Sequence, residues 1–345
     1  MSPGNSPDFG AERALKLVNN ARILITGGTG SFGQAFVRRI VELADPARIV
    51  IYSRDELKQY EMEQAFPPEM AGRLRFFLGD VRDLPRLEMA MRDIEYVIHA
   101  AALKQVPAAE YNPFECLHTN VVGAENVVHA AIRSGVKKVI ALSTDKASNP
   151  INLYGASKLA SDKIFVAANH LSGSTNVRFS VVRYGNVVGS RGSVVPLFRR
   201  LIETNAKSLP ITDERMTRFW ITLRSGVDFV LSCLDAMHGG EIFVPKIPSM
   251  RIIDVARAMA PHLPHHIIGI RPGEKLHEAM ISEDDARNTI EMDDRYIIEP
   301  AFAWWDRKAF DNGSAKRVAD GFRYSSDSNC EWLTADQLNR MREEA

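Results

Sequence analysis

The sequence predicts an α/β fold in which a doubly wound parallel sheet is joined by a smaller C-terminal lobe. Between Ile23 and Tyr184, apolar runs of strand length alternate with helical patterns. This alternation is typical of parallel sheets that are covered by helices on both faces. A glycine-rich turn follows the first apolar run, and polar segments follow the later ones. Because parallel strands end at the same edge of their sheet, these segments are expected to share one ligand site.

The composition is that of an ordinary soluble globular protein. The 345 residues are 45% hydrophobic and 25% charged, and 43 Lys and Arg balance 43 Asp and Glu. A net charge of zero gives no argument for nucleic acid or a membrane surface as a partner. The three cysteines are far apart and form no CxxC, which suggests no metal site and suits a reducing cytoplasm. No apolar run approaches the ~20 residues of a membrane helix.

The first predicted strand, Ile23–Ile25, runs directly into the glycine-rich segment Thr26–Gly33, and a helical pattern follows at Ala35–Leu43. A turn of this kind brings the backbone close to a pyrophosphate at the N-terminus of the helix. Its place between strand and helix is the one that the dinucleotide fingerprint requires, so we expect a bound dinucleotide. Two registers of the motif are satisfied, GxGxxG by Gly28, Gly30 and Gly33, and GxxGxxG by Gly27, Gly30 and Gly33.

The end of the second predicted strand, Arg48–Tyr52, bears on the choice between NAD and NADP. Folds that bind NAD place an acid here for the ribose 2′-hydroxyl, whereas folds that bind NADP offer an arginine for the 2′-phosphate. Ser53, Arg54 and Lys58 could hold a phosphate by hydrogen bonds and charge. We therefore favour NADP. Asp55 leaves NAD open, because a shift of one residue would make it the ribose acid.

Two further strand ends are expected to lie at the cofactor. Asp80 follows the predicted strand Leu74–Leu78 and could meet an adenine edge, or else cap the next helix. The small residues Ala100–Ala102 follow the predicted strand Tyr96–His99 and would let the backbone lie against a cofactor. Lys104, in the same loop, could face the substrate.

A long helix is expected over about 113–134. It leads to the fifth predicted strand, Val139–Leu142, which runs into the segment that carries the reaction chemistry. Tyr154 and Lys158 are four residues apart, so they share one face of a helix. A phenol has a pKa near ~10, and a neighbouring ammonium favours the phenolate. With the Thr144 hydroxyl on the same substrate oxygen, the pair could remove a proton from an alcohol while a hydride leaves its carbon. The alternative is an ordinary amphipathic helix face.

Beyond the sixth predicted strand, Phe179–Tyr184, the alternation weakens and prolines punctuate shorter elements. We therefore divide the chain into an N-terminal arm (1–20), a dinucleotide-binding domain (21–190) and a substrate-binding lobe with a C-terminal extension (191–345). Segments near 220–250 are expected to complete the domain. Four basic residues of the lobe could clamp a diphosphate or be separate surface charges, namely Arg191, Arg215, Arg218 and Arg271.

These motifs carry a resemblance to a known family. The glycine segment and the Tyr154/Lys158 pair resemble those of the extended short-chain dehydrogenase/reductases, which have a Rossmann fold. Within that superfamily, residues 20–282 resemble the inverting UDP-N-acetylglucosamine 4,6-dehydratases of pseudaminic acid biosynthesis. The segments that carry this closer resemblance are Ser53–Lys58, His99–Lys104, Ser143–Lys158, Tyr184–Val195, Met216–Thr222, Gly239–Met250 and Arg271–Glu278.

The resemblance implies a cytoplasmic homo-oligomer, expected to be a hexamer, that uses NADP and acts on UDP-N-acetylglucosamine without a metal. Its product would be a 4-keto-6-deoxy-L-hexose nucleotide. The expected cofactor-binding residues are Gly27, Thr29, Gly30, Ser31, Phe32, Gly33, Ser53, Arg54, Lys58, Asp80, Val81, Ala100, Tyr154, Lys158 and Val187. The expected substrate-binding residues are Lys104, Asn186, Arg191, Val194, Thr212, Arg271 and Glu274.

The catalytic residues that the resemblance implies are Thr144, Asp145, Lys146, Tyr154 and Lys158. Dehydratases that retain configuration at C5 typically read Thr-Asp-Glu where this chain has a lysine as the third residue. We expect Tyr154 to take the 4-hydroxyl proton, unprotonated Lys146 to remove the C5 proton, and protonated Asp145 to donate to the departing 6-hydroxyl. Lys146 would then need a depressed pKa, which burial and the Lys158 charge would supply.

Three alternatives remain open from the sequence. A retaining 4,6-dehydratase and a C4 epimerase share the predicted fold, although an epimerase needs no acid/base pair at C5 and C6. A catalytically silent NADP-sensing protein belongs to another class, and the set of Thr144, Tyr154 and Lys158 argues against it.

Overall fold

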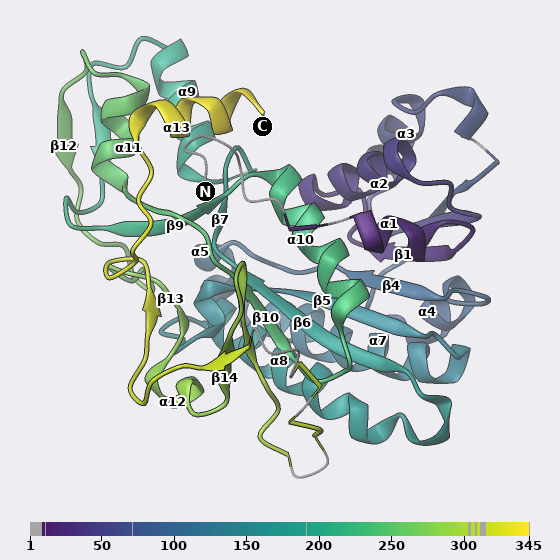
Figure 1. Ribbon diagram of the computed structural model, residues 1–345. Coiled ribbons are helices and arrows are strands. Elements are labelled where there is room, and N and C mark those ends of the chain that lie inside the picture. Colours follow the sequence, from purple (N-terminus) through teal and green to yellow (C-terminus); the bar gives the residue numbers. More distant parts are fainter. Residues whose placement is uncertain are drawn as a thin grey trace.

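The computed structural model describes residues 9–10, 12–70, 72–190, 192–302, 305–307, 309–310 and 315–344. Its centre is a ten-stranded sheet with the strand order β16-β14-β15-β10-β6-β5-β4-β1-β2-β3 (Figure 1). In chain order these strands are β1 (Arg22–Thr26), β2 (Arg48–Ser53), β3 (Leu74–Leu78), β4 (Tyr96–His99), β5 (Lys138–Thr144), β6 (Arg178–Tyr184), β10 (Ile242–Pro245), β14 (Thr289–Glu291), β15 (Arg295–Ile298) and β16 (Lys316–Arg317).

The run from β3 to β10 pairs in parallel throughout, which confirms the predicted parallel sheet. Thr26 at the end of β1 pairs with Tyr52 and His99, and Thr144 at the end of β5 pairs with Tyr184. The carboxyl ends of these strands therefore meet at one edge of the sheet. Helices cover both faces of a parallel sheet, so its strands read as continuous apolar runs, and residues 23–25 are fully buried accordingly.

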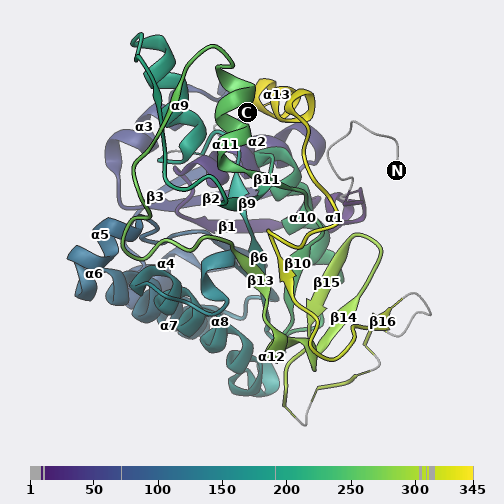
Figure 2. The same cartoon turned by 90° about the vertical axis from the view of Figure 1, so that its left-hand side faces the viewer.

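The helices lie in two layers with the sheet between them (Figures 1 and 2). One layer contains α1, α2 and α10, and the other contains α4, α7 and α8. Because the chain crosses to both faces, the sheet is doubly wound. The helices of this domain are α1 (Glu12–Val18), α2 (Ser31–Leu43), α3 (Glu56–Gln64), α4 (Leu84–Ala90), α5 (Val106–Tyr111), α6 (Pro113–Leu117), α7 (Gly123–Ser134), α8 (Leu153–Leu171) and α10 (Leu223–Ala236).

Two features of the domain differ from the sequence predictions. The strands β14, β15 and β16 are antiparallel to their neighbours, so the sheet is mixed and has one antiparallel edge. The helix that the sequence predicts over residues 113–134 contains a π-helical turn at His118–Val122, between α6 and α7. Side-chain periodicity cannot reveal either feature, because both depend on backbone pairing.

The lobe has a hydrophobic core of its own and lies at the upper left of Figure 1. Phe198, Trp220 and Leu338 are fully buried in this core and come from distant parts of the chain. The remaining elements of the chain are β7 (Asn186–Val187), α9 (Val194–Glu203), β8 (Leu209–Ile211), β9 (Thr217–Ile221), β11 (Ser249–Arg251), α11 (Ile252–Met259), β12 (His265–Ile267), β13 (Ala279–Ile281), α12 (Glu283–Ala286), β17 (Tyr324–Ser325) and α13 (Ala335–Glu343).

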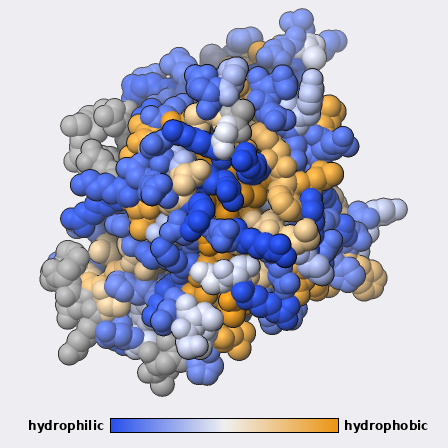
Figure 3. All heavy atoms as spheres, turned by 90° about the vertical axis from the view of Figure 1, so that its right-hand side faces the viewer, coloured by the Kyte–Doolittle hydropathy of each residue, from blue (hydrophilic) through white to orange (hydrophobic). Residues whose placement is uncertain are grey.

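The chain before β1 is docked on the domain where the structure describes it. Phe9 is 3% exposed, and its ring meets the ring of Phe229 of α10 edge-on, with 4.7 Å between centroids. The face turned toward the viewer in Figure 3 is mostly hydrophilic, with hydrophobic atoms showing between the polar ones. Among the described residues, no helix combines the length and apolar character needed to cross a membrane.

Candidate active site

A cavity of about 1160 Å³ lies at the carboxyl edge of the parallel strands, with walls from both the sheet domain and the lobe. It brings together almost all of the residues that the sequence predicts for the site. Asp145 is 1% exposed and lies behind the cavity wall, and Arg191 lies outside the described residues. The predicted residues that line the cavity are Gly27, Thr29, Gly30, Ser31, Phe32, Gly33, Ser53, Arg54, Lys58, Asp80, Val81, Ala100, Lys104, Thr144, Lys146, Tyr154, Lys158, Asn186, Val187, Val194, Thr212, Arg271 and Glu274.

The glycine turn between β1 and α2 forms a backbone cradle. Gly27 has φ +66°, and a Cβ added there would approach the backbone nitrogen of Ala101 to 2.8 Å. A Cβ on Gly33 would come within 2.4 Å of the Gly28 Cα. Gly30 caps α2 and has no side chain to satisfy the first N–H groups of the helix. Such a helix end attracts an anion, so this turn fits the pyrophosphate of a dinucleotide.

The end of β2 places Ser53 and Arg54 at the cavity wall. Ser53 is the last residue of the strand, and its Oγ is 2.8 Å from Thr29 Oγ1. Asp55 lies beyond the strand as the N-cap of α3, where it accepts a hydrogen bond from the Lys58 backbone N–H at 3.0 Å and from Lys58 Nζ at 2.5 Å. The position at which an NAD-binding fold places its acid is therefore occupied by a serine.

Asp80 is not the cap of the helix that follows it, because Asp83 caps α4. The Asp80 carboxylate is instead held by Arg82, at 2.8 Å from Nη2, and by Arg54 at 3.7 Å. Since Arg54 is about half exposed, its guanidinium can exchange this long contact for a ligand phosphate. Asp80 remains at the cavity wall, as the cofactor interpretation requires.

Tyr154 and Lys158 lie on the buried face of α8 and both reach the cavity. Burial raises the pKa of Tyr154 to about 12, although the Lys146 charge and a hydrogen bond with Thr144 oppose this shift. Burial lowers the pKa of Lys158, against the opposing charge of Asp162. The phenol is therefore protonated in the free protein at neutral pH. Lys146, which the sequence assigned to another step, supplies positive charge beside Tyr154.

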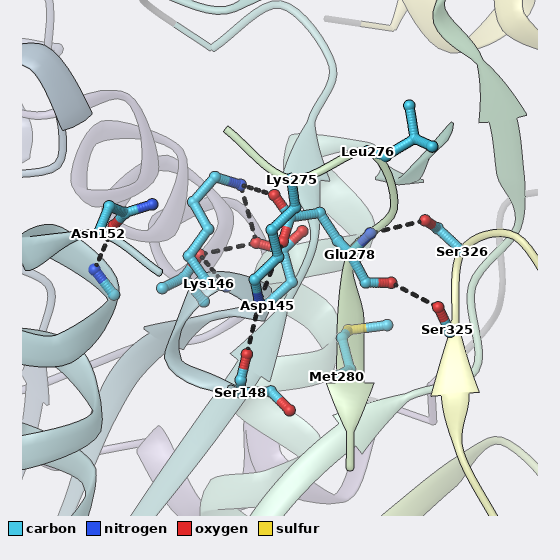
Figure 4. A network of polar contacts seen from close by, with 12 residues as sticks. Asp145, Lys146, Ser148, Asn152, Lys275, Leu276, Glu278, Met280, Ser325 and Ser326 are labelled. Carbon is cyan, nitrogen blue, oxygen red and sulfur yellow. Dashed lines mark hydrogen bonds and ion pairs between the residues drawn. The ribbon is translucent and has the colours of Figure 1, made fainter. Parts of the chain in front are cut away.

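Lys146 lines the cavity and lies between two carboxylates (Figure 4). Its Nζ is 3.0 Å from Asp145 Oδ1 and 3.2 Å from Glu278 Oε1. The Thr144 hydroxyl donates to the same Asp145 oxygen at 2.9 Å. Burial lowers the pKa of Lys146, but the two carboxylates outweigh burial, and the pKa is raised above its ordinary value. The expected depressed pKa is therefore wrong, and Asp145 accepts hydrogen bonds in the resting protein.

The lobe contributes cavity residues that the sequence did not assign to the site. Glu278 is 1% exposed, and Arg200 of α9 also lines the cavity. A charged residue directly before the apolar strand β13 was the available signal for Glu278. Of the predicted diphosphate clamp, Arg218 and Arg271 line the cavity, whereas Arg215 does not. Arg215 is exposed and pairs with Asp213 at 2.8 Å, so it is a separate surface charge, the alternative that the sequence left open for it.

No cluster of three or more His, Cys, Asp or Glu side chains that could hold a metal ion occurs among the described residues. The donors that converge on the cavity are backbone N–H groups, hydroxyls, ammonium groups and guanidinium groups. This set suits phosphate groups and alcohols rather than a hard cation.

The buried phenol gives a direct prediction for the free protein. Because the pKa of Tyr154 is raised, its neutral form persists as the pH rises through the ordinary value of ~10. We expect the ultraviolet difference spectrum between the wild-type protein and Tyr154→Phe to show no phenolate between about pH 7 and pH 10. A phenolate signal in that range, absent from the variant, would contradict the protonated state.

Comparison with known proteins places the chain among nucleotide-sugar enzymes. Residues 23–300 match the family model described as polysaccharide biosynthesis protein. A Campylobacter jejuni protein named UDP-N-acetylglucosamine 4,6-dehydratase (inverting) is 58% identical over 327 residues, or 93% of this chain and 97% of that protein. A Rickettsia bellii protein named UDP-glucose 4-epimerase is 43% identical over 283 residues, or 80% of this chain and 82% of its own.

Solved structures show the same architecture. The X-ray structure of Pen from Bacillus thuringiensis has 32% sequence identity and a TM-score of 0.85, covering 95% of this chain and 98% of its own. DesIV, a dTDP-glucose 4,6-dehydratase from Streptomyces venezuelae crystallised with NAD and TYD, has a TM-score of 0.65 at 24% identity, covering 74% of this chain and 86% of its own. The chain belongs to the polysaccharide biosynthesis protein family, within the extended short-chain dehydrogenase/reductases.

Proposed function

We propose that this protein is an inverting UDP-N-acetylglucosamine 4,6-dehydratase. The observation that carries the proposal is the cavity itself, in which Lys146, Tyr154 and Lys158 converge at the carboxyl edge of a dinucleotide-binding sheet. The relatives that bear this name are 58% identical over nearly the whole chain. The product is UDP-2-acetamido-2,6-dideoxy-β-L-arabino-hexos-4-ulose, formed by oxidation at C4, loss of water from C5 and C6, reduction at C6 and inversion at C5.

The cofactor is a nicotinamide dinucleotide, for which the glycine cradle and the first turn of α2 provide the pyrophosphate site. We assign it more closely as NADP. Ser53 and Arg54 lie at the end of β2, where the 2′-substituent of the ribose is expected, and Asp55 is already engaged as a helix cap. Bound NADP would supply the reversible hydride acceptor that the chemistry at C4 and C6 needs.

The residues of the chain move the protons. Tyr154 takes the proton of the 4-hydroxyl as it gives up its own phenol proton to Thr144. Thr144 is also hydrogen-bonded to Asp145, so the three side chains form a path for protons. This path carries the proton to Asp145. Because Asp145 lies behind the cavity wall, its proton reaches the departing 6-hydroxyl, which leaves as water, through the Thr144 hydroxyl that lines the cavity. Lys146 removes the C5 proton, which the C4 ketone has acidified. General acid/base groups of this kind contribute about 10²–10⁴-fold to a rate.

The lobe positions the sugar nucleotide. Asn186, Val194 and Thr212 line its side of the cavity, with Arg271 and Glu274 on the segment between β12 and β13. Lys104 faces them from the sheet domain. We expect the diphosphate of the sugar nucleotide to bind beside Arg271, because a guanidinium matches phosphate geometry.

We also propose that the protein is a cytoplasmic homo-oligomer, a hexamer by resemblance. Exposed apolar side chains such as Tyr111 (88%) and Phe114 (74%) are consistent with such an assembly.

A C4 epimerase is the second candidate, since relatives 43% identical bear the name UDP-glucose 4-epimerase. An epimerase uses the Tyr154 and Lys158 chemistry at C4 and needs no acid/base groups for C5 and C6. The ion pair of buried Asp145 and half-buried Lys146 beside Tyr154 favours the dehydratase.

The activity is tested by incubating the purified protein with UDP-N-acetylglucosamine in deuterated water, without added cofactor. Proton NMR is expected to show a C6 methyl signal, deuterium at C5 and L-arabino couplings. A product with D-xylo couplings from the outset would make the enzyme a retaining dehydratase, and UDP-N-acetylgalactosamine as the product would make it an epimerase. No reaction, even with added NADP, would reject both activities on this substrate.

Arg54→Ala tests the choice of cofactor. A charge-assisted hydrogen bond contributes about 1.5–3 kcal/mol, so the variant is expected to bind NADP about 10–100-fold more weakly. Its affinity for NAD should change little, because NAD has no 2′-phosphate. Calorimetric titration of both cofactors against both proteins measures the difference. Equal losses for NAD and NADP would contradict the assignment of Arg54 to the 2′-phosphate.

A further inference from the structure

Glu278 is a second buried carboxylate beside Lys146, and it comes from a distant part of the sequence. Asp145 and Lys146 follow β5 of the sheet domain, whereas Glu278 directly precedes β13. The Glu278 Oε1 atom is 3.2 Å from Lys146 Nζ, and the residue lines the cavity while being only 1% exposed. Figure 4 shows Lys146 pointing toward both acids.

The backbone holds Glu278 in this position from both sides. Its N–H donates to Ser326 Oγ at 3.0 Å, and its carbonyl accepts from the Ser325 hydroxyl at 3.2 Å (Figure 4). The same carbonyl also accepts from the Ser326 N–H at 2.8 Å. The segment before Glu278 is fixed to the loop between β5 and α8. Asn152 Nδ2 donates to the Gly273 carbonyl and Lys275 Nζ donates to the Ser148 carbonyl, each at 2.7 Å. The carboxylate is therefore placed by the fold rather than by its charge alone.

The Glu278 carboxylate retains an oxygen that the described protein does not satisfy. Its Oε2 atom is buried and has no hydrogen-bond partner among the described residues. Lys275 Nζ is 3.8 Å from this oxygen, and Arg218 Nε is 3.9 Å from Oε1, so both are charge contacts beyond hydrogen-bond distance. A buried carboxylate oxygen that is left unpaired at a cavity wall has the capacity to accept a proton.

The reaction proposed above needs such a group for two reasons. Lys146 is an ammonium in the resting protein, and an ammonium cannot remove the C5 proton. Inversion at C5 also requires that the proton leave from one face and return to the other. A single group cannot readily serve both faces, so a second proton carrier on another wall of the cavity is needed.

We propose that Glu278 is a catalytic residue that exchanges a proton with Lys146 and returns the proton to C5. This proposal rests on the proposed dehydratase function. The Lys146 ammonium first passes a proton to Glu278 Oε1, which leaves a neutral amine and a carboxylic acid. The amine then takes the C5 proton and becomes an ammonium again. After water has left and hydride has reached C6, the electron pair of the resulting enolate takes the Glu278 proton at C5, and the initial ion pair is restored.

Glu278→Gln is the decisive variant, because it keeps the size of the side chain and removes the carboxylate. In deuterated water with UDP-N-acetylglucosamine, kcat is expected to fall about 100-fold with KM within about threefold. The product, analysed at early times, is expected to contain both L-arabino and D-xylo forms, since solvent then delivers the C5 proton. Glu278→Asp keeps an acid and should recover part of the rate and the L-arabino preference.

Glu299→Gln is the matched control, because Glu299 is also a buried acid, 3% exposed, but does not line the cavity. Its carboxylate accepts from Arg307 at 3.2 Å and Arg317 at 3.0 Å. This variant is expected to lower the thermal midpoint and to keep kcat and the product configuration.

Two outcomes would overturn the role of Glu278. One is a Glu278→Gln protein that forms the L-arabino product alone at the wild-type rate. The other is a Glu278→Gln protein that still forms only the L-arabino product and loses NADP content and substrate affinity as much as it loses rate. Glu278 would then have a structural role only. A wild-type protein that forms no dehydrated product would instead reject the dehydratase function, so the two failures can be told apart.

Discussion

The ion pair between Lys146 and two buried carboxylates is the interaction on which the active site depends. Asp145 and Glu278 lie 3.0 Å and 3.2 Å from the lysine nitrogen and come from the segment after β5 and from the position before β13, respectively. The Lys146 ammonium is mostly withdrawn from water, with its side chain 23% exposed, and its charge would be costly without such partners. The same contacts that stabilise the charge therefore join the two parts of the chain and fix the protonation state of the group at the reaction centre.

The resting charge state differs from the one that the chemistry requires. Lys146 is held as an ammonium and Tyr154 as a phenol, although each must act as a base in turn. Protons must therefore move between neighbouring groups before and after each step. The hydrogen bonds of Thr144 with Asp145 and the contact of Lys146 with Glu278 provide such neighbours at 2.9 Å and 3.2 Å. Binding of the cofactor and the sugar nucleotide changes the local charge and excludes water, and we expect this binding to start these proton transfers.

The sequence predicts those parts of the fold and site that local patterns determine. The parallel strands, the glycine turn and the Tyr154/Lys158 pair each follow from a few consecutive residues, and the shared edge of the sheet then brings them together. Glu278 reaches Lys146 across 132 positions of the chain, so no spacing rule could connect the two. From the sequence, burial and the Lys158 charge suggested a depressed lysine pKa. That prediction failed because the Asp145 and Glu278 carboxylates together outweigh burial. The antiparallel β14–β15 pair likewise depends on contacts that periodicity does not encode.

The most direct test of this account is the pKa of Lys146, measured by NMR of protein labelled at the lysine ε-carbon, with Lys146→Arg used to assign the signal. The account predicts a pKa above the ordinary value of ~10.4 in the wild-type protein. It also predicts a lower value in Glu278→Gln, where one carboxylate has been removed. A Lys146 that is already neutral near pH 7 in the free protein, or a pKa that Glu278→Gln leaves unchanged, would contradict the account.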